Sequence, residues 1–195
     1  MGAVRARRGS VLRAWLVAHD ATALVIALGV VTLVGVLHAW SSVPGVRGGR
    51  LPVWLLVPPL LALFAGLGAT SAVPRLLWHE PAVRARLAWS LLVCLVAGAG
   101  GELVGASAAQ PMLGASAAVM TGLVFGASVV LGRLAPVLAA VPIIVLLVQV
   151  HAARDLTPAR IWDALPLAAQ AAVWAGWALM LLLHARLGDR AAASD

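Results

Sequence analysis

Residues 98–127 read GAGGELVGASAAQPMLGASAAVMTGLVFGA, two apolar segments separated by a short break. In each segment a small residue recurs at every fourth position: Ala97, Gly101, Gly105 and Ala109 in the first, and Gly114, Ala118, Gly122 and Gly126 in the second. Small side chains at this spacing form a ridge along a helix, and such ridges let two helix backbones approach closely inside a membrane. The stretch therefore predicts two transmembrane helices in tight contact.

A third ridge of small residues lies in an apolar segment near the C-terminus, at Ala168, Ala172 and Gly176. The same reasoning predicts that this segment is a further partner in a compact helical core.

The composition predicts that the chain lies in a membrane. Of its 195 residues, 63% are apolar and 11% are charged, and the mean hydropathy is +1.01. A soluble globule of this size cannot bury so much apolar surface. We therefore expect one all-α domain over residues 1–195, embedded in the lipid bilayer and without a soluble appendage.

A helix needs about 20 apolar residues to cross the hydrocarbon core of a bilayer, and six segments come near that length. They are residues 15–37, 52–73, 87–108, 112–131, 134–150 and 165–184. The first is too long for the core of a signal peptide, so we expect the mature protein to retain it. The prediction is a polytopic bundle of six transmembrane helices.

The arginines predict the orientation, since the chain has no lysine. With the N-terminus in the cytoplasm, ten of the fourteen arginines fall on the inner side and four on the outer side. The positive-inside rule then places both termini in the cytoplasm. The arginine-rich and alanine-rich composition indicates a GC-rich bacterial genome, and hence a bacterial inner (plasma) membrane.

The net charge of +7 does not by itself indicate nucleic-acid binding. The arginines are scattered along the flanks of the predicted spans, which is typical of anchoring to an anionic inner leaflet. Cys94 is the only cysteine, and no pair of the five histidines has metal-ligand spacing with a carboxylate on the same helix face. We expect no nucleic-acid partner, no metal and no cofactor.

Glu102 is the only charged residue deep inside a predicted span. Counted from Leu87 at about 1.5 Å per residue, it lies about 22 Å along the third span. A carboxylate at that depth can reach the outer headgroups, or it can serve as a proton or ligand site. No chain of carboxylates crosses the membrane, which weakens an ion-coupled transporter interpretation.

The Gly100-Gly101 pair late in the third span, the short outer break, and Gly114-Ala115-Ser116 at the start of the fourth span resemble the rhomboid-like superfamily. These six-span intramembrane serine proteases carry their nucleophile in a Gly-x-Ser motif near the outer end of the fourth helix. The resemblance covers about 30 residues and implies that Ser116 occupies the position of that nucleophile.

The other parts of that catalytic machinery are missing. The family supplies a histidine base from an Ala-His-x-Gly-Gly pattern in the sixth helix, and the matching place here is Ala169-Gln170-Ala171-Ala172. Gln170 therefore stands where the base would be, and an amide cannot accept the serine proton. The family's oxyanion-stabilising His and Asn in the second helix also have no counterpart, because the chain contains no asparagine. The resemblance thus predicts a catalytically inactive member.

Three function classes stay open. The first is a non-catalytic pseudoprotease that binds transmembrane segments of other proteins, with the Pro-rich second span and the sixth span forming a lateral opening. The second is an exporter permease subunit of the ABC-2 type, whose inner loop 74–86 would contact an ATPase and whose segment 154–165 would form a short outer helix. The third is an active intramembrane protease that uses Ser116 with an unusual base.

The second span contains the adjacent prolines Pro58 and Pro59. Each removes a backbone hydrogen-bond donor, so the pair predicts a gate-like break in the outer third of that helix. Pro136 and Pro142 predict a similar distortion of the fifth span.

Overall fold

The computed structural model describes residues 21–44, 50–69, 81–154 and 157–188, and all structural statements below concern these ranges. They contain seven α-helices: α2 (Ala21–Leu37), α3 (Val53–Ala69), α4 (Pro81–Ala108), α5 (Leu113–Leu131), α6 (Ala135–Arg154), α7 (Pro158–Ala164) and α8 (Leu167–Leu187). A short antiparallel ribbon of β1 (Ser42–Pro44) and β2 (Arg50–Pro52) joins α2 to α3, with Val43 opposite Leu51. A single 3₁₀ turn (Gly132–Leu134) joins α5 to α6. The predicted all-α class is confirmed.

Three helices are long and apolar enough to cross a membrane: Val83–Ala108, Leu113–Leu131 and Leu167–Leu187. Three further apolar helices are shorter, at Ala21–Leu37, Val53–Gly68 and Ala135–Leu146. Each of the six predicted segments overlaps one of these helices. The chain is therefore a helical protein with at least three helices fit to cross a bilayer, and passage of all six stays a prediction, as does the orientation of the termini.

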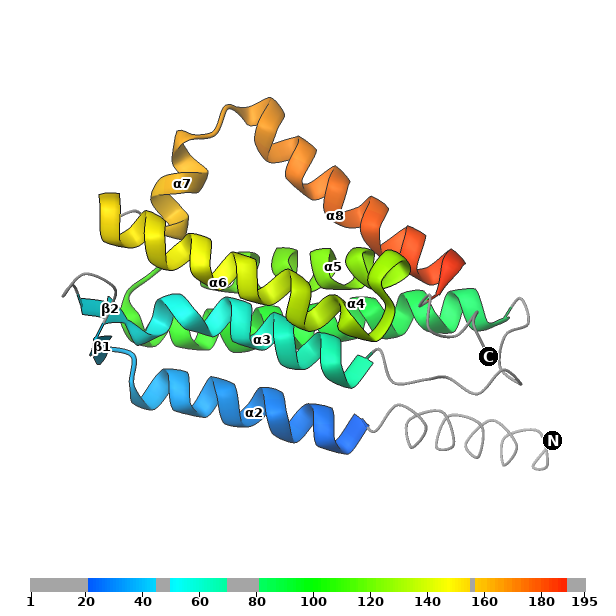
Figure 1. Cartoon of the computed structure of the whole chain (residues 1–195), viewed down its shortest axis with the longest axis horizontal. Coiled ribbons are helices and arrows are strands. Elements are labelled where there is room, and N and C mark those ends of the chain that lie inside the picture. Colours follow the sequence, from blue (N-terminus) through cyan, green and yellow to red (C-terminus); the bar gives the residue numbers. More distant parts are fainter. Residues whose placement is uncertain (1–20, 45–49, 70–80, 155–156, 189–195) are drawn as a thin grey trace.

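Helix α5 is the centre of the bundle, since it packs against α3, α4, α6 and α8. Helices α2 to α6 lie in a stack, whereas α8 runs obliquely away from it (Figure 1). Helix α7 forms the corner that joins the end of α6 to the start of α8, so α6, α7 and α8 outline a triangle above α5. This triangle surrounds the candidate site described below.

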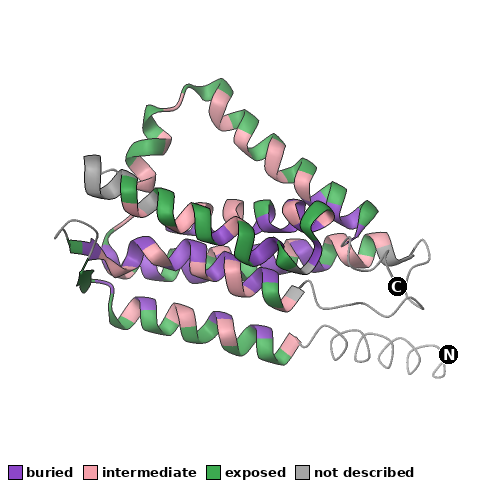
Figure 2. Ribbon diagram, viewed as in Figure 1, coloured by how far each residue is buried: buried purple, intermediate pink, exposed green. Residues whose placement is uncertain are grey.

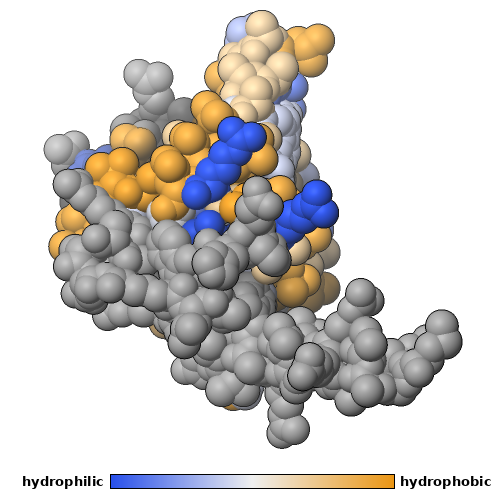
Figure 3. Space-filling view, turned by 90° about the vertical axis from the view of Figure 1, so that its right-hand side faces the viewer, coloured by the Kyte–Doolittle hydropathy of each residue, from blue (hydrophilic) through white to orange (hydrophobic). Residues whose placement is uncertain are grey.

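Burial follows the same arrangement. Leu61 and Ala65 of α3 and Leu113 and Phe125 of α5 are fully buried. Exposed residues cover the outward faces of α2 and α6 and most of α8 (Figure 2). Many of these exposed residues are large and apolar. In an end-on view of the bundle, the described part of the surface is mostly hydrophobic, with a few strongly hydrophilic side chains (Figure 3). Such a surface suits contact with lipid rather than with water.

The predicted break at Pro58 and Pro59 is wrong. Helix α3 continues through both prolines from Val53 to Ala69, and both side chains are buried. The prolines remove only the hydrogen bonds that their own nitrogens would donate, and packing of α3 against α4, α5 and α6 supports the remaining backbone. Helix α6 likewise continues through Pro142.

The turn between α4 and α5 is tight and held by an unusual backbone. Ala109 and Met112 both have positive φ values, 53° and 72°, in the left-handed region that few residues other than glycine adopt. The N–H of Gln110 donates to the carbonyl of Gly105 at 2.8 Å. A side chain on Gly105 would lie 2.6 Å from the carbonyl oxygen of Gln110, so this position requires glycine.

Candidate functional site

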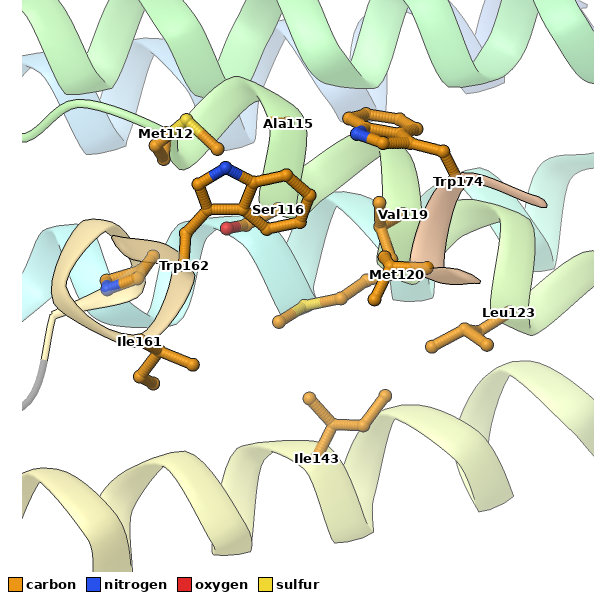
Figure 4. Close-up of a pocket in the computed structure, with 12 residues that line it drawn as sticks. Met112, Ala115, Ser116, Val119, Met120, Leu123, Ile143, Ile161, Trp162 and Trp174 are labelled. Atoms are coloured by element: carbon orange, nitrogen blue, oxygen red, sulfur yellow. The ribbon is translucent and has the colours of Figure 1, made fainter. Parts of the chain in front are cut away.

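A pocket with a volume of about 260 Å³ lies inside the triangle of α6, α7 and α8 (Figure 4). Its floor is formed by Met112 of the α4–α5 turn and by five residues of α5: Ala115, Ser116, Val119, Met120 and Leu123. The walls are formed by Ile143 of α6, Pro158, Ile161 and Trp162 of α7, and Val173 and Trp174 of α8.

The predicted lateral opening between the second and sixth spans stays a prediction. Helix α3 contributes none of the residues that line this pocket, because it packs against α5 and α6 on another side of the bundle. The walls of the pocket come from α6, α7 and α8.

The lining of the pocket is almost entirely apolar. Its polar atoms are the Ser116 hydroxyl and the indole nitrogens of Trp162 and Trp174, and no lining residue has a titratable side chain. Figure 4 shows these polar atoms in the half of the pocket near Met112 and Ala115, whereas Leu123 and Ile143 lie at the other end. The pocket is therefore more polar at the α7 end and purely apolar at its deeper end.

Three tryptophans connect the corner helix to the floor of the pocket. The rings of Trp162 and Trp174 meet edge to face with centroids 6.2 Å apart, and those of Trp174 and Trp177 do so at 5.8 Å. Trp177 donates its indole N–H to the carbonyl of Ala118 at 3.0 Å. Because rigid aromatic pairs of this geometry attract each other, the three rings fix the wall that α8 presents to the pocket.

Ser116 is the fourth residue of α5, and its side chain is half-buried in the pocket. The histidine of α8, His184, lies near the C-terminal end of that helix, where it contacts Ser128. The α8 residues that line the pocket lie nearer the N-terminal end. Among the residues that line the pocket there is no group that could take the Ser116 proton. In this geometry the Ser116 hydroxyl is a group that can form a hydrogen bond with a molecule in the apolar pocket.

Gln170, which the resemblance predicts at the position of a base, is directed to α7. Its amide nitrogen donates to the carbonyls of Trp162 at 3.1 Å and Leu165 at 3.2 Å. These carbonyls end the short helix α7, so the side chain closes the α7–α8 corner. The hydrogen bonds give Gln170 a structural role that the sequence did not reveal.

The first two predicted ridges meet at the α4–α5 crossing. A methyl group on Gly101 would lie 2.7 Å from the Leu113 carbonyl oxygen and 3.1 Å from Cβ of Ala117. One on Gly114 would lie 2.6 Å from a carboxylate oxygen of Glu102. The two backbones therefore touch where the glycines lie, and any larger residue would push the helices apart.

The lower part of the α5 ridge receives α8 instead of α4. The side chain of Trp177 fills the space over Gly122, and Met180 fills the space over Gly126. Together with the hydrogen bond from the Trp177 indole to the Ala118 carbonyl, these contacts hold α8 against one face of α5. One ridge thus serves two neighbours, α4 at its start and α8 further along.

The predicted packing of Gly176 against another helix is not seen among the described residues. Apart from its chain neighbours and the backbone of its own helix, no described atom lies within 4 Å of a Cβ built on Gly176, and Ala168 and Ala172 are exposed. The reason is that α8 meets α5 through its large residues, and only its C-terminal part is buried, at Leu181, His184 and Ala185. The small-residue ridge of α8 faces away from the bundle.

Glu102 is exposed beside the start of α5, where its carboxylate lies against Gly114. Within the described residues, no group of three His, Cys, Asp or Glu side chains could hold a metal ion.

One pair of polar residues escaped the sequence analysis. Ser128 of α5 and His184 of α8 are both buried, with Oγ and Nδ1 3.1 Å apart. Each residue stands three positions before the end of its helix. In the sequence, the two residues lie at a similar depth in the predicted fourth and sixth spans, and this agreement could have indicated that they pair.

Comparison of the chain with protein-family models, with curated proteins and with solved structures finds no match in any of the three.

Proposed function

We propose that this chain is a non-catalytic integral membrane protein that binds transmembrane segments of other proteins on the side where α8 leaves the bundle. The proposal includes six spans with both termini in the cytoplasm and a rhomboid-like arrangement in which α5 is the central helix. The observation that carries it is the pocket: a serine lies in an apolar cavity beside a helix whose N-terminal half is unpacked.

The position of α8 supports the binding role. Its residue Leu167 is 81% exposed, and a Cβ built on Gly176 would meet no other helix within 4 Å among the described residues. Helices in a bilayer associate through close packing and small residues rather than through the hydrophobic effect. An apolar helix that leaves part of its length without contacts, next to a pocket, offers a surface for another helix.

The chemistry of the pocket supports the non-catalytic part. A serine hydroxyl becomes a nucleophile only when a positioned base removes its proton. Ser116 has no titratable neighbour in the pocket lining, and Gln170 uses its amide hydrogens on the backbone of α7. The same serine can still donate a hydrogen bond to a bound segment.

A titration with a synthetic single-span peptide tests the proposal. The full chain, with Cys94→Ala to remove its own thiol, carries an environment-sensitive fluorophore at Leu123→Cys in lipid nanodiscs. The matched control carries it at Leu33→Cys, an exposed position of α2. We expect a saturable emission change at position 123 from peptides of about 20 Leu and Ala residues with central Phe, and none at position 33. Equal responses, or none at position 123, would argue against client binding.

The exporter interpretation keeps one specific observation in its favour, because the short helix it requires before the last span exists as α7 (Pro158–Ala164). Its predicted ATPase contact, in loop 74–86, falls largely outside the described residues. Co-purification of an ATPase with the intact chain, lost when that loop is replaced by a Gly-Ser linker, would favour this second candidate.

A further inference from the structure

We propose that the pocket holds one acyl chain of a bilayer phospholipid, from the leaflet on the α7 side. The site is the same pocket that the proposed function uses, but the inference needs no protein partner. It rests on the size of the pocket, its depth in the bilayer and the placement of its few polar atoms.

The volume favours a single chain. About 260 Å³ is on the order of nine times the share of one liquid water molecule, and well above an engineered 150 Å³ cavity that takes up benzene. The pocket is therefore large enough to take up a segment of a flexible aliphatic chain.

The depth matches one leaflet. The floor of the pocket runs from Met112, just before α5, to Leu123, a span of eleven residue steps, which is about 16 Å at 1.5 Å per residue. The hydrocarbon core of a bilayer is about 30 Å thick. The pocket thus extends from near one interface to about the middle of the membrane, as a single acyl chain does.

The polar atoms are at the correct end for a phospholipid. The Ser116 hydroxyl and the indole nitrogens of Trp162 and Trp174 lie toward Met112, and the deeper half near Leu123 and Ile143 is apolar (Figure 4). Tryptophan N–H groups favour the level of the headgroups and esters. These donors would face the ester carbonyl of the lipid while its chain runs toward Leu123.

An occupant is expected on physical grounds. If the pocket were empty, the side chains of its walls would lose the dispersion contacts that an occupant provides. Water is a poor occupant, because a buried water molecule needs two to four polar partners and the deeper half of the pocket offers none. Because the pocket is not enclosed and its walls come from helices with exposed apolar residues, the bilayer itself can supply chains that restore these contacts. A client segment that inserts side chains here has to displace the lipid first.

Photo-crosslinking in proteoliposomes tests this inference. The probe is phosphatidylcholine with a diazirine near the middle of one acyl chain, and adducts on the full-length protein are mapped by mass spectrometry. We expect adducts at Met120, Leu123 and Ile143 to exceed those at Val25 and Ile26 of α2, which are more exposed. Leu123→Trp, which fills the pocket from a partly exposed position, should lower the adducts at Met120 and Ile143 on the order of fivefold, which corresponds to about 1 kcal/mol of binding free energy at 1.4 kcal/mol per tenfold.

Leu33→Trp on α2 is the matched control and should leave the adducts at Met120 and Ile143 unchanged. Ile143→Trp provides a second filling variant if Leu123→Trp does not fold. The inference is overturned if the pocket is labelled no more than α2, or if neither filling variant lowers its labelling. This experiment contains no client, so its failure is separate from failure of the peptide titration.

Discussion

Ser128 of α5 and His184 of α8 form a buried polar contact between the two side chains, with Oγ 3.1 Å from Nδ1. The Ser128 hydroxyl also donates to the carbonyl of Phe125 at 2.7 Å. The centroids of the His184 and Phe125 rings lie 4.9 Å apart, with the ring planes tilted by 36°. A serine has one proton to donate, so the contact is satisfied when Nδ1–H donates to Oγ. In this arrangement the pair anchors the C-terminal end of α8 and does not activate the serine.

We predict that Ser128 and His184 stabilise the fold as a coupled pair. Ser128→Ala and His184→Ala should each destabilise the protein, and a double-mutant cycle should give a coupling of about 1 kcal/mol, the usual net value of one hydrogen bond. Thermal unfolding in detergent measures it. Ser107→Ala, whose hydroxyl bonds only within its own helix to Leu103, should show no coupling to His184→Ala.

Gly122 and Gly176 offer a matched pair of substitutions. Gly122→Ala should cost about 1–3 kcal/mol, because the new methyl group collides with the Trp177 side chain and overpacks the α5–α8 contact. Gly176→Ala should change stability by less than about 1 kcal/mol, since nothing described lies near it. Unfolding midpoints that move equally for both would contradict the packing of α8 described above.

Gln170 gives a prediction about the corner of α7 and α8. Gln170→Ala removes two hydrogen bonds to the end of α7 and should loosen that helix, seen as faster proteolysis or hydrogen exchange within residues 157–166. Gln170→Leu, of similar size, should do the same, because shape cannot replace the lost donors. Unchanged exchange in both variants would show that other contacts hold the corner.

The same position tests the relation to the proteases. Gln170→His restores the residue type of the family's base, yet it should not make Ser116 reactive, because position 170 is directed to the backbone of Trp162 and Leu165. Reactivity toward a fluorophosphonate is the readout. A variant that became labelled at Ser116 would place the two side chains closer than this structure does.

The helices themselves were predictable from the sequence, because length and hydropathy locate apolar segments. The predicted end of the third span at 108 and the predicted fourth span at 112–131 agree with α4 and α5 to within a residue. The α4–α5 crossing followed from Gly101 and Gly114, since close backbone contact leaves a local trace of small residues.

Other features depended on tertiary contacts that leave no local trace. The ridge at Ala168, Ala172 and Gly176 has the same spacing as the α5 ridge, yet it faces outward because α7 turns the start of α8 away from the bundle. The pocket arises from that same corner, which Gln170 closes through backbone carbonyls that no side-chain pattern reveals. The pairing of Ser128 with His184 required knowing that α5 and α8 are neighbours.

The central claim is that Ser116 lies in a binding pocket and is not a nucleophile. Labelling of the purified protein in lipid with a fluorophosphonate probe, compared between the unaltered chain and Ser116→Ala, tests it most directly. We expect the same background signal from both proteins. Labelling of the unaltered chain that disappears in Ser116→Ala would show an activated serine and contradict the claim.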